Sequence, residues 1–316
     1  MIKQLIQKLK TERENIYIQT HNFPDPDAVA SAFGLQQLLK MEGITANIIF
    51  DGVIQRTALN KMISELSIDI RQTSEYKMFA TDKIIIVDGC KRNKNVTDLI
   101  GEEIAVIDHH TGKEPDDVEF VDIQPDTGAC SSIITSYFIE MERKIPEVAA
   151  TVLLTGLFRD TDSMTRNVSV MDVTAYTELY KQADKLKFNS MVLNNLTLDD
   201  LRFYTNVISN LKTKGDIAFC YINDECNQNL LGILGDFILS LVEIKFTALF
   251  ANNDQVINIS FRNESPEINA AEVMKEAVLG IGSGGGHKQM AGGIINNKKT
   301  FKPDLMFKKI ITIISR

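Results

Sequence analysis

Apolar residues in the first half of the chain occur alternately in short continuous runs and at helical spacing. Residues 83–87 include three consecutive isoleucines and end at Asp88, which is typical of a strand buried in a parallel sheet. The same criteria predict strands at residues 15–20, 46–50, 83–87 and 104–107, and helices at residues 28–41, 131–143, 148–158 and 173–185. Strands separated by helices predict an α/β fold with a parallel sheet.

The pattern changes after residue 185. Residues 186–211 are first polar and rich in asparagine and then helical, so we expect a linker there that acts as a hinge. Beyond it the sequence predicts strands at residues 217–222, 245–251 and 256–261, helices at 230–242 and 270–279, and a hairpin turn at 252–254. The expected organisation is an N-terminal parallel-sheet domain at 1–185, a helical linker at 186–212 and a smaller α+β domain at 213–316.

Composition limits the kind of partner. The chain has 316 residues and a net charge of −8, which argues against a broad binding surface for long nucleic acid but allows a short nucleotide held by a few local cations. No apolar run approaches the roughly 20 residues that a membrane span needs. The four cysteines have neither CxxC nor metal-ligand spacing, so we expect reduced thiols and a cytoplasmic location.

The four histidines all lie in short polar segments. His21 opens the first segment, in which Asp25 and Asp27 follow the first predicted strand. Two carboxylates this close repel each other unless a positive charge lies beside them, and with an imidazole they suit Mn²⁺ or, less selectively, Zn²⁺ or Fe²⁺. The alternative is that Asp25 or Asp27 only caps the following helix. Capping needs one carboxylate, however, and leaves His21 unexplained.

Further acidic residues and histidines follow other predicted strands and helices. Asp88 ends one apolar strand, where a simple turn is an equally good interpretation. Asp108, His109 and His110 end the next strand, and fortuitous histidines in a surface loop are the weaker alternative there. Asp160 lies where an apolar helix gives way to a polar loop, but Asp162 is as plausible on local grounds.

A glycine cluster marks the second half. Gly284, Gly285 and Gly286 precede His287, and consecutive glycines let backbone N–H groups converge on an anion. A flexible loop tip is the alternative, but His287 and Lys288 beside the glycines favour an anion site. Arg262 ends a predicted strand and is a candidate for a bidentate phosphate contact.

Together these segments resemble the DHH phosphoesterase family, through the triplet Asp108-His109-His110, and its DHHA1 partner domain, through Gly284-Gly285-Gly286-His287. The resemblance covers nearly the whole chain and includes the order and spacing of the motifs. It implies an enzyme like the compact two-domain members, which degrade short oligoribonucleotides, adenosine 3′,5′-bisphosphate or linear and cyclic dinucleotides. The resemblance is also compatible with a homodimer, and it implies no membrane partner.

The resemblance also implies roles for individual residues. One metal ion is assigned to His21, Asp25 and Asp88, and a second to Asp27, Asp88, His109 and Asp160. Asp108 is expected to support His109, and His110 to face the scissile phosphate. The chain departs from many members that degrade short RNA at Asp162, where they have glycine; Arg159 and Arg166 flank this position and either offset its charge or contact substrate.

The expected chemistry is hydrolysis of a phosphoester in a small nucleotide with two Mn²⁺ ions, for which Mg²⁺ or Co²⁺ are substitutes. The glycine segment, His287 and Arg262 are expected to hold a second phosphate of the substrate. One alternative is a single-strand exonuclease, which needs a basic channel with aromatic residues, whereas this chain has no tryptophan and is acidic. Another is a nucleotide-binding regulator without turnover, although such a protein needs no complete ligand set.

Overall fold

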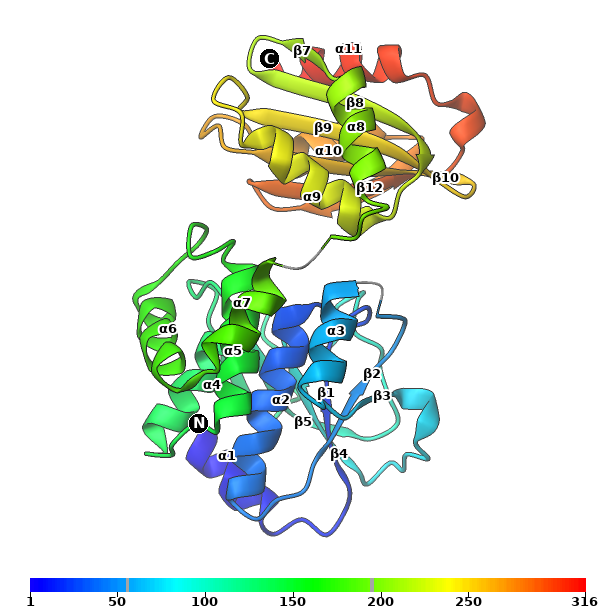
Figure 1. Cartoon of the computed structure of the whole chain (residues 1–316). Coiled ribbons are helices and arrows are strands. Elements are labelled where there is room, and N and C mark those ends of the chain that lie inside the picture. The colour runs from blue at the N-terminus through cyan, green and yellow to red at the C-terminus, as the bar shows by residue number, and fades with distance from the viewer. Residues whose placement is uncertain (55–56, 194–195) are drawn as a thin grey trace. The chain divides into compact units, whose positions relative to one another are not determined.

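The computed structural model describes residues 1–54, 57–193 and 196–316. The chain divides into two compact units, Met1–Asn195 and Leu196–Arg316 (Figure 1). The linker expected at 186–212 includes residues 194–195, which lie outside the described residues. No described helix combines the length and the apolar composition needed to cross a lipid bilayer.

The N-terminal unit is built on a parallel sheet, as predicted. Its described strands follow the order β3-β2-β1-β4-β5-β6. Their bounds are Ile16–Gln19 (β1), Asn47–Phe50 (β2), Ile70–Gln72 (β3), Lys83–Val87 (β4), Glu102–Asp108 (β5) and Phe120–Ile123 (β6). The four predicted strands correspond to β1, β2, β4 and β5, whereas β3 and β6 were not predicted because they are short and only partly buried.

The strand order reverses between β1 and β4. The chain passes from β1 outward to β2 and β3 and then returns to place β4 on the other side of β1. Gln19 at the end of β1 pairs with Ile86 near the end of β4, so the two carboxyl ends lie side by side. Ligands of open parallel sheets bind at such a reversal, beyond the carboxyl ends of the strands.

Helices cover one face of this sheet and loops cover the other (Figure 1). The helices are α1 (Ile2–Leu9), α2 (Pro26–Met41), α3 (Thr57–Glu65), α4 (Cys130–Glu140), α5 (Glu147–Asp160), α6 (Val170–Gln182) and α7 (Lys185–Leu193). On the helical face, α2 and α5 approach closely because Gly34 has no side chain: a Cβ there would lie 2.7 Å from Leu153. On the other face, Ile86 and Val106 pack against loop residues such as Val96.

Helices α7 and α8 occupy most of the region expected to be a linker. Helix α7 packs on α5, where the rings of Phe158 and Phe188 are 5.3 Å apart. Helix α8 (Leu201–Asn210) instead buries Phe203 and Val207 in a hydrophobic cluster of the C-terminal unit. The sequence did not predict that α7 packs on the N-terminal unit, because the apolar residues of this helix show no strong helical periodicity.

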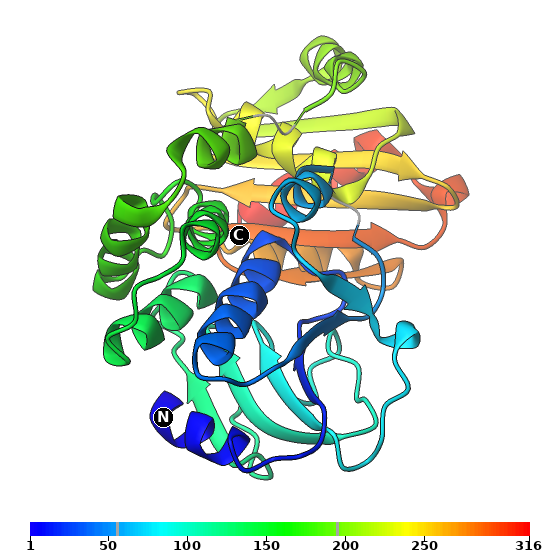
Figure 2. The ribbon, with the colours of Figure 1, turned by 60° about the horizontal axis from the view of Figure 1, so that its bottom comes forward.

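The C-terminal unit is a smaller α+β structure, as predicted (Figure 2). Its sheet has the order β11-β12-β10-β9-β8-β7, with β8 and β9 parallel and the other neighbours antiparallel. The strands are Lys212–Lys214 (β7), Ile217–Glu225 (β8), Phe246–Asn253 (β9), Val256–Asn263 (β10), Gly282–Gly286 (β11) and Met290–Ile295 (β12). Helices α8 and α9 (Gln228–Leu239) cover one face, and α10 (Ala270–Val278) and α11 (Pro303–Ile314) the other.

The predicted hairpin in this unit is confirmed, because β9 and β10 pair antiparallel and Asn253 faces Val256. Its turn comes slightly later than residues 252–254, since β9 continues through Asn253 and Asp254 takes the left-handed backbone conformation (φ 50°). The flexible-loop alternative for the glycine cluster does not hold, because the cluster forms the edge strand β11. Glycine has low strand propensity, but pairing with β12 and the contact of Gly284 with Met274 of α10 outweigh that preference.

Candidate metal centre

Six residues from distant parts of the sequence meet at the carboxyl edge of the parallel sheet. His21 follows β1, Asp88 follows β4, and His109 follows β5; Asp25 and Asp27 begin α2, and Asp160 ends α5. They form two groups, His21 with Asp25 and Asp88, and Asp27 with His109 and Asp160, and within each group the candidate ligand atoms lie within 4.8 Å of one another. Asp88 forms a further such group with His109 and His110.

Asp88 lies between the two groups. Its Oδ2 is 3.6 Å from Nε2 of His21, and its Oδ1 is 3.3 Å from Nε2 of His109. The residue is buried, and its left-handed backbone (φ 55°) turns the chain sharply after β4. Oδ1 has no hydrogen-bond partner among the described residues. A buried carboxylate oxygen in this condition is costly unless a positive charge satisfies it.

The two histidines of these groups present the same ring atom to Asp88. Nδ1 of His21 donates to the carbonyl of Asn22 at 2.8 Å, and Nδ1 of His109 donates to the carbonyl of Thr127 at 3.1 Å. A carbonyl oxygen can only accept, so Nδ1 carries the proton in each ring. A neutral ring then has an unprotonated Nε2, which is the arrangement typical of metal-binding imidazole.

Asp27 is held by the beginning of α4. It accepts hydrogen bonds from the backbone N–H groups of Cys130 at 2.7 Å and Ser131 at 3.1 Å, and from the hydroxyl of Ser131. Burial and the nearby carboxylates of Asp88 and Asp160 raise the pKa of Asp27 well above its usual range. The α4 N-terminus thus fixes an acidic side chain in a place where its charge needs compensation.

Asp25 caps helix α2, as the alternative interpretation expected, and it also remains a candidate metal ligand. Its Oδ1 accepts hydrogen bonds from the N–H groups of Asp27 at 2.9 Å and Ala28 at 3.1 Å, which starts α2. The same carboxylate offers a ligand atom to the group with His21 and Asp88. One side chain therefore serves both the helix and the site.

The structure also distinguishes Asp160 from Asp162. Asp160 lies 3.3 Å from Nε2 of His109, whereas the side chain of Asp162 is 60% exposed and pairs loosely with Arg166. Burial and the charge of Asp25 raise the pKa of Asp160 to about 6. Arg166 additionally donates to the backbone carbonyl of Asp160 at 2.9 Å, so it helps to hold the end of α5.

Asp108 supports a different histidine from the one expected. Its Oδ1 lies 2.8 Å from Nδ1 of His110 and accepts from that ring, while Nδ1 of His109 is bound to Thr127. The backbone N–H groups of His109 and His110 also donate to Asp108. The expectation failed because β5 ends at Asp108 and the turn after it brings the second imidazole, not the first, back to the carboxylate.

The two neighbouring imidazoles have distinct electrostatic surroundings. Burial alone would lower the pKa of His109, but Asp88 and Asp160 outweigh it and raise the pKa to about 11. The hydrogen bond to Asp108 raises the pKa of His110 to about 9. Both shifts arise from the negative charge gathered at the strand ends, which a divalent cation would neutralise.

Several residues that position the site were missed in the sequence. Asn22 donates to Oγ1 of Thr97 at 3.0 Å, and that hydroxyl donates to Asp51 at 2.7 Å, which ties together the chain after β1, β2 and β4. Thr127 and Ser131 support His109 and Asp27. These are common polar residues with no spacing that marks them, so only the fold brings them together.

Arg159 makes structural contacts rather than the contact with Asp162 or substrate that was considered for it. Its guanidinium donates to the carbonyls of Met191 at 2.7 Å and Val192 at 2.8 Å, at the end of α7. These contacts satisfy carbonyls that a helix terminus leaves without a partner. Arg159 therefore helps to fasten α7 to α5.

In the C-terminal unit, Arg262 is engaged in contacts within the unit. Nε donates to Asp236 at 2.6 Å, and Nη1 donates to Oγ of Ser260 at 2.9 Å and to the carbonyl of Phe261 at 3.1 Å. The side chain lies under α9, where a Cβ on Gly232 would meet Nη2 at 2.6 Å. A bidentate phosphate contact would require the guanidinium to exchange one of these partners.

The glycines of β11 differ in what they permit. A Cβ on Gly284 would lie 2.6 Å from Met274 of α10, so this glycine allows the helix to pack on the sheet. Gly286 has a φ of 150° and marks the end of the strand. A Cβ on Gly285 would meet nothing within 4 Å, so its backbone borders open space. His287 is exposed just after the strand, in the turn that its N–H closes by donating to Met290 at 2.7 Å.

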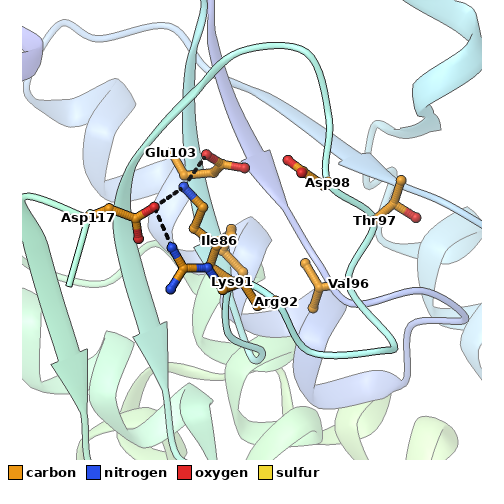
Figure 3. Close-up of a pocket in the computed structure, with 8 residues that line it drawn as sticks. All are labelled: Ile86, Lys91, Arg92, Val96, Thr97, Asp98, Glu103 and Asp117. Carbon is orange, nitrogen blue, oxygen red and sulfur yellow. Dashed lines mark hydrogen bonds and ion pairs between the residues drawn. The ribbon is translucent and has the colours of Figure 1, made fainter. Parts of the chain in front are cut away.

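A separate cavity of about 300 Å³ lies on the loop-covered face of the parallel sheet (Figure 3). Its charged side chains largely neutralise one another: Lys91 lies 3.0 Å from both Glu103 and Asp117, and Arg92 lies 2.9 Å from Asp117. The lining residues are Ile86, Lys91, Arg92, Val96, Thr97, Asp98, Glu103 and Asp117. The cavity contains none of the residues of the two candidate metal groups.

The fold and the site define a two-unit α/β protein with a carboxylate–imidazole centre at a sheet reversal. Residues 15–157 match the DHH family, N-terminal domain, and residues 214–315 match the DHHA1 domain. The chain belongs to the DHH/DHHA1 family, which confirms the resemblance inferred from its motifs.

Individual relatives match over most of the chain. An uncharacterized protein of Methanocaldococcus jannaschii is 29% identical over 290 residues, and the match covers 90% of this chain and 59% of that protein. The bifunctional oligoribonuclease and PAP phosphatase NrnA of Mycoplasma genitalium is 26% identical over 304 residues, with 90% of each chain covered. The crystal structure of an exopolyphosphatase-related protein from Bacteroides fragilis shares the fold, with a TM-score of 0.81, 21% identity, and coverage of 99% of this chain and 95% of that one.

Proposed function

We propose that this chain is a two-metal phosphoesterase that hydrolyses short nucleotides. The substrates would be oligoribonucleotides of a few residues, linear or cyclic dinucleotides, or a 3′,5′-bisphosphonucleotide. The observation that carries the proposal is the place of Asp88, whose two carboxylate oxygens face the imidazoles of two different ligand groups. A shared carboxylate is how proteins hold two like-charged ions close together.

The residues present fit a pair of divalent ions. The groups combine four carboxylates with two imidazoles whose Nδ1 atoms are already bound to carbonyls. The buried Oδ1 of Asp88 accepts no hydrogen bond from a described residue, which is the state expected of an oxygen kept for a cation. One ion would bind His21, Asp25 and Asp88, and the other Asp27, Asp88, His109 and Asp160. Oxygen-rich sites with imidazole suit Mn²⁺, with Mg²⁺ or Co²⁺ as substitutes.

Two such ions, when bound, supply a hydroxide nucleophile near neutral pH and positive charge for the phosphoryl oxygens. The chain itself contributes orientation and a proton donor. Asp108 fixes the ring of His110 through Nδ1 and favours its protonated form, so His110 would donate a hydrogen bond or a proton to a phosphate oxygen through Nε2. Asp27, held by three donors from α4, would keep its ligand geometry without rearrangement.

A short nucleotide is the substrate class that the rest of the chain supports. The acidic balance of the chain, −8, disfavours long nucleic acid, and the M. genitalium relative covered over 90% of its length is named for oligoribonuclease and PAP phosphatase activity. The open backbone at Gly285 and the exposed His287 would hold a second phosphate. Arg262 would take part if its pair with Asp236 opens.

The proposal is tested with purified chain stripped by a chelator and then supplied with Mn²⁺. Metal content would be measured by mass spectrometry, and turnover on a diadenosine dinucleotide, a three-residue oligoribonucleotide and adenosine 3′,5′-bisphosphate. We expect no turnover after stripping, and recovery with two ions bound per chain. The Asp160→Asn variant should be inactive, while Asp162→Asn, a change two residues later and outside the cluster, should remain active. Turnover that survives exhaustive stripping, or metal-loaded chain inert on all three substrates, would refute the proposal.

A further inference from the structure

Phe23 has a backbone conformation that its residue type disfavours. It lies between His21 and Asp25, two of the candidate metal ligands, and has a φ of 57°, in the left-handed region. Glycine, asparagine and aspartate adopt this conformation most readily, and a bulky residue there is an outlier. Outliers of this kind cluster at functional sites, where the surrounding structure enforces them.

The surroundings of Phe23 enforce both its backbone and its ring. Its N–H donates to the carbonyl of Asp51 at 3.2 Å, and the Asp51 carboxylate accepts from Thr97 at 2.7 Å. The ring lies over Gly52, where a Cβ would be 2.9 Å from Cε1 of Phe23. Gly52 has a φ of 78°, so the turn after β2 both requires a glycine and provides the flat surface under the ring.

Core packing does not account for this aromatic side chain. Phe23 is 57% exposed and belongs to none of the hydrophobic clusters of the described residues. Phe79 and Tyr180, the other exposed aromatic residues in the described part of the N-terminal unit, lie elsewhere: Phe79 precedes β4, near Lys77, and Tyr180 lies on α6, stacked on Tyr176. Among the exposed phenylalanine and tyrosine residues of the described N-terminal unit, Phe23 is the one at the carboxyl edge of the sheet.

The geometry points to Phe23 as a nucleobase platform, a residue that stacks on one base of the substrate while its phosphate lies at the candidate metal centre. The inference rests on the proposed function for the identity of the substrate. The phenyl ring packs against Gly52, is exposed, and lies two residues from a metal-ligand candidate on each side, so it is placed beside the site where the phosphate would bind. Stacking on an aromatic face is tolerant of base identity, so Phe23 would favour nucleotides over other phosphoesters without choosing among bases.

Binding can be tested without turnover because the chain contains no tryptophan. Phe23→Trp introduces one fluorophore at the platform, and Phe79→Trp introduces one at an exposed phenylalanine that precedes β4, away from the carboxyl edge of the sheet. Adenosine monophosphate should quench the fluorescence of Phe23→Trp saturably, whereas ribose 5-phosphate should not, and Phe79→Trp should respond to neither. No quenching of Phe23→Trp by adenosine monophosphate, or equal quenching by ribose 5-phosphate, would overturn the inference.

Kinetics then separate this inference from the proposed function. With Mn²⁺ present, Phe23→Leu should lower kcat/KM on a diadenosine dinucleotide by about tenfold or more, mostly through KM, as expected for loss of one stacked base. Phe23→Tyr, which keeps an aromatic ring, should have a kcat/KM near that of wild type. Phe79→Leu should leave kcat/KM unchanged. On the same dinucleotide lacking both bases, Phe23→Leu should match wild type within about twofold, and an equal loss on both substrates would contradict the platform. Quenching without any hydrolysis would keep the platform and reject the proposed enzyme.

Discussion

Asp108 and His110 are joined by a hydrogen bond of 2.8 Å between Oδ1 and Nδ1, while His109, which lies between them in the chain, turns to the carbonyl of Thr127. The two adjacent imidazoles are therefore held by different partners. His109 presents Nε2 to Asp88 and Asp160 at 3.3 Å each, as a ligand would. His110 remains partly exposed, in a position to meet a substrate.

This division predicts that substitutions of the two neighbouring histidines differ in their effect on metal content. His110→Ala should leave metal content near that of wild type and lower kcat by about 10²–10⁴-fold, the range for loss of an acid–base or charge-stabilising group. His109→Ala should lose metal as well as activity. Metal analysis and steady-state kinetics of the two variants decide the matter. Loss of a metal equivalent in His110→Ala would make that residue a ligand and remove it from the role proposed here.

Much of the N-terminal unit and of the site was predictable from the sequence. Buried parallel strands such as residues 83–87 are continuous apolar runs, and the polar residues after them must lie at one edge of the sheet. That reasoning brought His21, Asp88 and His109 together. It was insufficient to choose Asp160 over Asp162, because the choice depends on where α5 ends relative to the sheet.

Other features depended on tertiary contacts that no local pattern shows. The turn after β5 decides which histidine Asp108 holds, and the contact of Met274 with β11 decides that glycines form a strand. The partners of Arg262 come from α9 and from β10 itself. The residue type of Arg262 suggested a phosphate ligand, whereas in the fold its guanidinium already donates hydrogen bonds to Asp236 and Ser260.

The two central glycines of β11 should respond differently to alanine. Gly284→Ala forces a Cβ to within 2.6 Å of Met274 and 2.9 Å of the carbonyl of Gly292, so it should lower the free energy of unfolding by about 1–3 kcal/mol, as overpacking does. Gly285→Ala places its Cβ in open space and should leave stability within about 0.5 kcal/mol of wild type. Chemical denaturation of both variants measures the difference. If Gly285→Ala is the more destabilised variant, the packing described for this strand is wrong.

A cluster away from the site predicts a pH dependence of stability. Glu42 accepts hydrogen bonds from Lys10 at 2.9 Å and Arg143 at 2.8 Å, which hold the pKa of its carboxyl below the usual range. A group whose pKa is lowered by folding stabilises the protein above its unfolded pKa, and the contribution is lost as pH falls through the folded value. Glu42→Gln should therefore lower Tm at neutral pH, and the difference from wild type should shrink as pH falls below the unfolded pKa of glutamate, about 4.3.

Thermal unfolding in the presence of a chelator, at a series of pH values, tests this without a contribution from bound metal. Glu140→Gln, a change at an exposed residue of α4, serves as the control and should leave Tm near that of wild type throughout. A Tm difference for Glu42→Gln that stays constant from neutral to acid pH would show that its effect does not arise from the charge of Glu42.

The central claim is that Asp88 holds two metal ions together. The most direct measurement is the metal content of wild type and Asp88→Asn after loading with Mn²⁺ and dialysis. Asparagine suits this variant because it tolerates the left-handed backbone of Asp88 (φ 55°) while removing the charge. We expect about two ions per chain in wild type and a loss at both positions in the variant, with turnover below about a tenth of wild type. A wild-type chain that binds a single ion, or an Asp88→Asn chain that keeps both ions and its turnover, would contradict the account.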